Sequence, residues 1–206
     1  FRGCIFFVTP PITNDYPVSI ENLTLDGGLT NGYTPNLPRP FPANIVDGNG
    51  WDGSHVAYDE RGFTGHVFTH LLWTNLLFSH WRGEIVKSNG HATNGNLTMV
   101  NCTFEDGNAT AFNIYDSLLI TNCFFDNLFQ VSEYYQLDST NRSYFLGNTV
   151  TNLHGNGMAF NGATGVSPGM LISNNNFYVS DNGGYSMILT TPGVNLMISS
   201  NNFVYP

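Results

Sequence analysis

Two stretches of the chain decide the fold: LTMVNCTF, residues Leu97 to Phe104, and LLITNCFF, residues Leu118 to Phe125. Each contains a short apolar run, then an asparagine, then an aromatic residue three positions later. The same phrase returns elsewhere, in LLWTNLLF (Leu71 to Phe78), MLISNNNF (Met170 to Phe177) and LMISSNNF (Leu196 to Phe203), and more loosely in VSIENLTL (Val18 to Leu25) and YFLGNTV (Tyr144 to Val150). Repetition at this period indicates one supersecondary unit per repeat, stacked into a solenoid.

The asparagine position of the phrase, called the anchor below, sets the length of each repeat. Anchors fall, with steps of 26, 21, 25, 27 and 26 residues from the second onward, at Asn22, Asn75, Asn101, Asn122, Gly147, Asn174 and Ser200. The intervening segments are rich in Asn, Gly, Thr and β-branched residues, which disfavour helix. No stretch keeps an apolar 3.6-residue period over four turns. About three short strands per repeat are therefore expected, paired in parallel at a spacing of ~4.8 Å.

Stacked coils place like residues above like, and two columns of the repeat show this. The position after the anchor predicts a ladder of small side chains: Cys102, Cys123, Asn148, Asn175 and Asn201. The position three after the anchor predicts an inward aromatic stack: Phe78, Phe104, Phe125, Phe177 and Phe203. Cys102 and Cys123 lie one coil apart, which a disulfide would tolerate, although stacked free thiols are favoured. A later strand also recurs, in residues 83–88, 111–115, 129–133, 157–162 and 186–191.

With these repeats the chain resembles the right-handed parallel β-helix superfamily, which includes pectate lyases, polygalacturonases and phage tailspikes. The resemblance covers Val18 to Phe203 and implies an all-β, right-handed parallel β-helix solenoid of about six to seven coils of 21–27 residues. No single family is assigned. Of the polygalacturonase motifs only a His-Gly is present, at His154-Gly155, and no pectate lyase motif is recognisable.

The repeat register is lost between the first two anchors. Residues 26–65 are rich in Gly, Pro and Asn and are expected to form an irregular loop or a lid inserted into a single domain that spans residues 1–206. Both interpretations stay open, since long loops on rigid scaffolds often carry function. The chain begins at Phe1 and ends in what reads as mid-coil, so it is expected to be part of a longer protein.

Composition narrows the class of partner. The net charge of −9, with Lys and Arg numbering only 6, argues against nucleic acid. The negative charge also argues mildly against polyanionic glycans as partners, unless calcium bridges the protein and the glycan. No apolar run is long enough to span a membrane. A surface low in charge and rich in Asn, Gly and Thr suggests a secreted or cell-surface protein, and glycosylation sequons occur at Asn22, Asn96, Asn101, Asn108 and Asn141.

Ionisable residues cluster after the second anchor and predict a catalytic site. Glu84 lies nine residues after its anchor and Glu133 eleven after its own, so both are expected near the same strand position two coils apart. That is roughly 9–10 Å, close to the carboxylate separation of an inverting glycosidase. The alternative is that Glu84 pairs with Arg82 or Lys87 on a solvated face. For lyase chemistry, Lys87 or Arg82 would act as the base.

Aromatic and imidazole side chains accompany these candidates. Trp81, Tyr134 and Tyr135 are predicted to stack on sugar rings, with His80 beside them as a further substrate-binding residue.

A second cluster suggests a cation. Glu105, Asp106 and Asp126 follow their anchors by four or five residues on adjacent coils. Oxygen ligands of this kind suit calcium, so Ca²⁺ is the candidate cofactor. The alternative is ordinary exposed acids in a turn.

Two functions from different classes follow. The first is a secreted enzyme that hydrolyses or cleaves a polysaccharide in a groove along the side of the solenoid. The second is a non-catalytic structural or adhesive module of a surface layer, fibre or spike, which would act as a homo-oligomer or a longer filament. The weight given to carbohydrate comes from the resemblance to the superfamily, because fold alone does not determine function.

Overall fold

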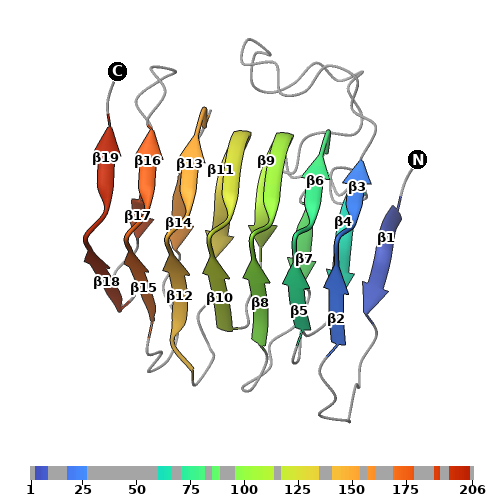
Figure 1. Cartoon of the computed structure of the whole chain (residues 1–206), viewed down its shortest axis with the longest axis horizontal. Helices are drawn as coiled ribbons and strands as arrows, with labels where there is room; N and C mark the ends of the chain where they lie inside the picture. Colours follow the sequence, from blue (N-terminus) through green and yellow to red (C-terminus); the bar gives the residue numbers. More distant parts are fainter. Residues whose placement is uncertain are drawn as a thin grey trace.

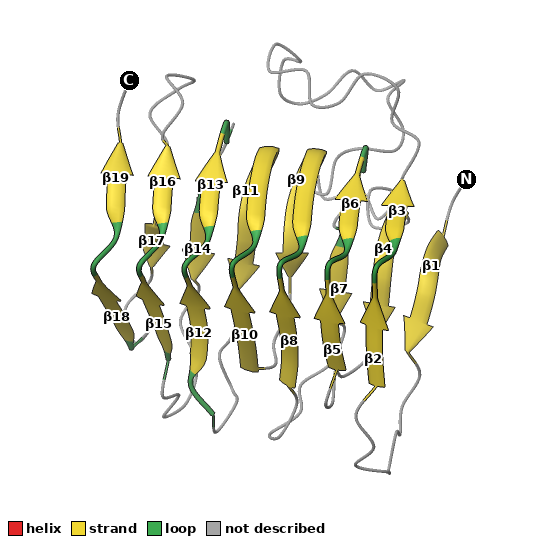
Figure 2. Cartoon of the chain, in the orientation of Figure 1, coloured by secondary structure: helices red, strands yellow, loops and turns green. Residues whose placement is uncertain are grey.

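The computed structural model describes residues 3–8, 18–26, 60–65, 71–81, 85–88, 96–113, 117–134, 141–153, 157–160, 169–178, 188–190 and 195–204. Every regular element in these residues is a β-strand, and all strand pairs are parallel (Figure 2). None of them forms a helix long and apolar enough to cross a membrane.

One sheet has seven strands, each of which comes directly before an anchor. Its order is β18-β15-β12-β10-β8-β5-β2. Its strands are β2 (Val18–Glu21), β5 (Leu71–Thr74), β8 (Asn96–Val100), β10 (Ser117–Thr121), β12 (Ser143–Leu146), β15 (Met170–Ser173) and β18 (Leu196–Ser199). Side chains alternate between the core and the outside, as in the buried–intermediate pattern of β5.

The other sheet has twelve strands in two arms. The first arm follows the anchors: β3 (Thr24–Asp26), β6 (Leu77–Ser79), β13 (Thr149–Thr151), β16 (Asn176–Tyr178) and β19 (Asn202–Val204). The second arm contains β1 (Gly3–Val8), β4 (Glu60–Gly65), β7 (Val86–Ser88), β14 (Met158–Phe160) and β17 (Ile188–Thr190). Two long strands belong to both arms: β9 (Thr103–Asn113) and β11 (Phe124–Tyr134).

The strands therefore form three stacked series that advance together along the long axis of the molecule (Figure 1). Each coil contributes at most one strand, or one half of a long strand, to each series. This arrangement of parallel strands is consistent with a β-solenoid. The predicted later strand of the repeat is confirmed as the second arm, which includes β7, β14, β17 and the ends of β9 and β11. Strand β4 lies within the segment expected to be irregular, and residues 27–59 fall outside the described residues.

The anchor is a left-handed turn residue. All seven anchor positions have φ between 53° and 65°, and five of them are asparagine. Asparagine and glycine tolerate this conformation, which costs most other residues about 1–2 kcal/mol. The N–H of each of the first six anchors also donates to the carbonyl of the residue before the next anchor, as Asn101 does to Thr121 at 3.2 Å. The recurring asparagine thus bends the chain between the seven-stranded sheet and the first arm.

The ladder predicted behind the anchor is confirmed. The Asn148 and Asn175 side chains are buried, and each Oδ1 accepts the backbone N–H of the preceding coil, from Cys123 and Asn148 at 2.8 Å in both cases. Asn175 Nδ2 donates to Asn201 Oδ1 at 2.8 Å. Cys102 and Cys123 continue the column as free, buried thiols, and the Cys102 N–H points at Cys123 Sγ at 3.4 Å. The ladder satisfies backbone groups at a turn that lies inside the core.

The aromatic stack is also confirmed, with one substitution. Phe78, Phe104 and Phe125 stack nearly in parallel, with ring centroids 4.7 and 5.1 Å apart. Val150 occupies the next position, and Phe145 from β12 brings its ring toward the gap, 5.7 Å from Phe125. Phe177 and Phe203 resume the stack at 5.0 Å.

Candidate functional site

A second left-handed turn follows the first arm, five residues after each of four anchors. His80, Asp106, Asn127 and Asn152 have φ between 50° and 59°. This column is hard to recognise in the sequence because the residue type changes from coil to coil. The usable signal was a polar residue of the Asn, Asp or His kind at anchor plus five, since these residues are enriched at positive φ.

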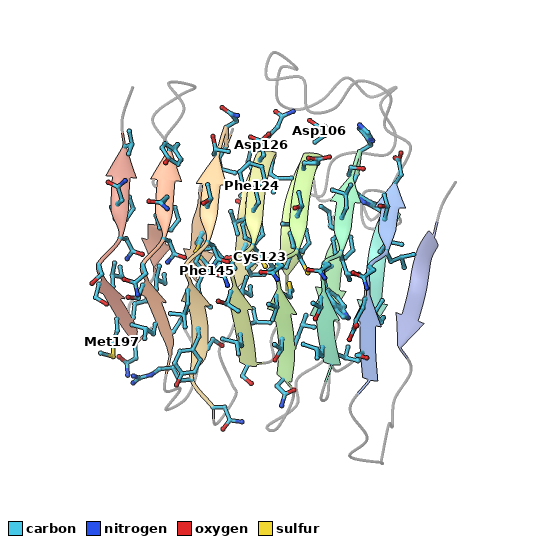
Figure 3. The ribbon with its side chains drawn as sticks, in the orientation of Figure 1. Asp106, Cys123, Phe124, Asp126, Phe145 and Met197 are labelled. Atoms are coloured by element: carbon cyan, nitrogen blue, oxygen red, sulfur yellow. The ribbon has the colours of Figure 1, made fainter. Side chains whose placement is uncertain are left out.

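Carboxylates gather at the strand positions just before this turn. Asp26, Ser79, Glu105 and Asp126 are consecutive register partners across β3, β6, β9 and β11. Together with the turn residues His80 and Asp106, the acids of this row form what we call the acidic turn surface: Asp26, His80, Glu105, Asp106 and Asp126. Figure 3 shows Asp106 and Asp126 at the same edge of the molecule, at the top of the view.

Hydrogen bonds between coils order this surface. His80 Nδ1 lies 3.2 Å from Asp26 Oδ1, and its Nε2 lies 3.7 Å from Asp106 Oδ2. Asn127 Nδ2 donates to Asp106 Oδ1 at 2.5 Å.

The Asp126 carboxylate is held by an asparagine amide, as Asp106 is, since Asn152 Nδ2 donates to Asp126 Oδ1 at 2.7 Å. The surface is therefore organised by named partners and is not a loose collection of acids.

Glu105 is a carboxyl group on this surface whose pKa is shifted. Partial burial raises its pKa above the ordinary value, and the charges of Asp106 and Asp126 raise it further, while His80 acts in the opposite direction. Desolvation and like charges both disfavour the ionised form. Asp126 lies directly beside it on the next strand, so their backbones are about 4.8 Å apart. A carboxyl whose pKa is raised, beside one that accepts a hydrogen bond from an amide, can serve acid–base chemistry.

The predicted calcium site falls on this surface. Among the residues that the structure describes, no group of three or more His, Cys, Asp or Glu side chains could hold a metal ion. Two of the predicted ligands, Asp106 and Asp126, already accept hydrogen bonds from asparagine amides. Calcium at Glu105, Asp106 and Asp126 stays a prediction.

Trp81 requires a correction. We expected its ring to stack on a sugar, but only 4% of the residue is exposed. Its Nε1–H donates to the carbonyl of Leu25 at 3.1 Å. Trp81 therefore presents no ring face for a sugar, because the ring packs into the core beneath the second turn. His80, predicted as a substrate-binding residue, lies on the acidic turn surface, and its role in binding stays a prediction.

Of the predicted catalytic residues, Lys87 lies in β7 and Glu133 near the end of β11, both in the second arm. Arg82, Glu84 and Tyr135 fall outside the described residues, and for Lys87, Glu133 and Tyr134 only the backbone is described. Phe112 is the register partner of both Val86 and Ser132.

The next residues along the chain, Lys87 and Glu133, therefore occupy equivalent positions on β7 and β11. With β9 between these strands, the backbones of the two residues are roughly 9–10 Å apart. The catalytic pairing of Glu84 and Glu133 stays a prediction.

No family model, curated protein or solved structure matches this chain significantly. Its function therefore has to be inferred from its own geometry.

Proposed function

We propose that the chain is a right-handed parallel β-helix that acts on a polysaccharide outside the cell, with hydrolysis at the acidic turn surface. The observation that carries the proposal is the pair formed by Glu105 and Asp126. The two are side by side on adjacent strands, and the pKa of Glu105 is raised by burial and by neighbouring carboxylates.

The two carboxyls have different roles in this proposal. Glu105 donates its proton to the glycosidic oxygen, because a raised pKa keeps a carboxylic acid protonated closer to neutral pH. Asp126, oriented by the amide of Asn152, attacks the anomeric carbon as a carboxylate and forms a glycosyl ester. Glu105 then deprotonates the water that hydrolyses this ester.

The spacing favours one stereochemical outcome. Retaining glycosidases hold their carboxyl groups about 5–5.5 Å apart, whereas inverting enzymes need about 6.5–9.5 Å. A separation of one strand suits the retaining mechanism. Phe124 supports a sugar at the next position, since it lies two residues before Asp126 on the same outward face and is 38% exposed.

The test is product analysis after incubation with a panel of neutral and acidic polysaccharides, with and without calcium. We expect reducing sugars whose anomeric configuration, followed by NMR, is initially retained. Glu105→Gln and Asp126→Asn should abolish them. Glu21→Gln, which alters an exposed carboxylate on β2, is the matched control and should not. Unsaturated products would indicate a lyase and refute the proposed roles.

A non-catalytic structural module is the second candidate. The ladder and the aromatic stack favour it, because stacked repeats that satisfy their own backbone groups make a stiff rod. A folded protein that releases no product from any polysaccharide would favour this candidate, with secretion or cell-surface display expected in either case.

A further inference from the structure

A shallow groove lies on the outer face of the seven-stranded sheet, away from the acidic turn surface. It has a volume of about 250 Å³ and crosses β8, β10 and β12. We call it the sheet-face groove, and its outward lining side chains are Asn96, Thr98, Leu119, Asn141, Arg142 and Tyr144.

The floor of the groove is apolar and aromatic. Thr98, Leu119 and Tyr144 are consecutive register partners, so their side chains form one outward row. Tyr144 is 37% exposed, unlike the phenylalanines that fill the core. An exposed tyrosine beside a leucine offers a flat surface on which a ring with an apolar face can rest.

The rim of the groove is polar. Asn96 begins β8, and Asn141 lies two residues before β12, so side-chain amides border the aromatic floor. Arg142 also lines the groove, but its Nη1 donates to Met197 Sδ on β18 at 3.1 Å, so the guanidinium lies on the side of β12 away from β8 and β10. Asparagine supplies both donors and an acceptor. A ring with an apolar face and a hydroxylated edge, which is the chemistry of a pyranose, matches this combination.

Size and charge narrow the ligand further. Ligand pockets usually measure about 300–1,000 Å³, so this groove accommodates about one ring of a longer chain. The protein carries a net charge of −9, which repels a polyanion at long range. The guanidinium of Arg142 lies toward Met197 on β18 and does not offset that field at the groove, so a neutral saccharide is favoured over an acidic one.

We propose that the sheet-face groove binds one ring of a neutral saccharide chain, stacked on Tyr144 with its hydroxyls on Asn96 and Asn141. The class of ligand rests on the proposed function, but the site is separate from the carboxylates and performs no chemistry. It holds the polysaccharide on the side of the solenoid.

The test is calorimetric titration with cellohexaose, xylohexaose and mannohexaose, and with hexagalacturonate as the acidic counterpart. The protein is produced in bacteria so that the sequons at Asn96 and Asn141 stay unmodified. We expect at least one neutral probe to bind, and to bind at least about tenfold more tightly than hexagalacturonate. Tyr144→Ala should weaken that binding at least about tenfold, and Tyr144→Phe should retain most of it.

Tyr178→Ala is the matched control, because Tyr178 is 43% exposed but lies on β16 in the other sheet. It should bind as the wild type does. Shifts of the Asn96 and Asn141 side-chain amide signals on titration of the unmutated protein give a readout that needs no variant. Absence of binding by every neutral probe, tighter binding of hexagalacturonate, or equal losses in Tyr144→Ala and Tyr178→Ala would overturn the proposal.

The two proposals fail separately. Glu105→Gln should leave the affinity of the groove unchanged while it removes hydrolysis. Binding that depends on Tyr144 in a protein that hydrolyses nothing would refute the catalytic proposal alone.

Discussion

Replacement of one buried asparagine tests the physical account of the ladder. Asn148 is fully buried, and its Oδ1 accepts the N–H of Cys123 at 2.8 Å. Its Nδ2 donates to the carbonyl of Ile120 and to Asn175 Oδ1, both at 3.1 Å. Asn148→Ala removes all three hydrogen bonds and leaves the Cys123 N–H without this acceptor inside the core.

The expected cost follows from these contacts. A buried donor left unsatisfied costs about 1–3 kcal/mol, and each further hydrogen bond contributes about 0.5–1.5 kcal/mol net. Because the effects overlap, we expect Asn148→Ala to lower the free energy of unfolding by about 2–4 kcal/mol. For a chain of this size that corresponds to a decrease in Tm of about 4–16 °C.

The measurement is thermal and guanidinium unfolding followed by circular dichroism. Asn202→Ala is the control, because Asn202 is exposed and its side chain makes one long bond, at 3.4 Å to Asn176. It should cost less than about 0.5 kcal/mol. Asn148→Cys should cost less than Asn148→Ala, since a thiol occupies the equivalent position in the two preceding coils. Equal stabilities of Asn148→Ala and Asn202→Ala would refute the role given to the ladder.

Three further predictions concern other parts of the repeat. Asn101→Val should lower the free energy of unfolding by about 1–2 kcal/mol and Asn101→Gly by much less, because the anchor has a φ of 54°; equal losses in chemical denaturation would contradict this. The raised pKa of Glu105 makes its contribution to stability present at low pH and lost as pH rises through that pKa. The Tm of Glu105→Gln relative to wild type should therefore be higher at pH 7 than at pH 3.5, and a difference independent of pH would refute the environment described. In a Cys4→Ser background, Cys102 and Cys123 should not react with a thiol reagent until the protein unfolds, because both side chains are buried. The hydrogen bond with Cys102 and burial also raise the pKa of Cys123. Rapid labelling of the native protein would contradict this prediction.

Much of the fold was predictable because stacking repeats a physical requirement at every coil. The left-handed turn selects asparagine or glycine, the interior of that turn selects a small hydrogen-bonding side chain, and the core selects a ring three residues later. These requirements leave a visible period in the sequence. The replacement of an aromatic ring by Val150 in this column, with the ring of Phe145 beside it, was not predictable, because Phe145 comes from a different strand.

The candidate site was only partly predictable. Glu105, Asp106 and Asp126 were correctly grouped, because the period places equivalent residues on adjacent coils. Trp81 was wrongly expected at the surface, since nothing in its sequence context indicated that the Leu25 carbonyl, 56 residues away, would accept its N–H. The sheet-face groove was not anticipated at all, as its rim and floor come from three strands whose outward residues differ in every coil.

The sequence by itself therefore determined the parallel stacking, the bend at each anchor, the inner ladder and the aromatic column, because each is a local demand repeated at a fixed spacing. Apart from the acids that the period already grouped, the tertiary structure alone decided which outward side chains meet. Outward positions carry no packing requirement that would repeat from coil to coil, so His80 between Asp26 and Asp106, and Tyr144 beside Leu119, become neighbours only through the register between coils.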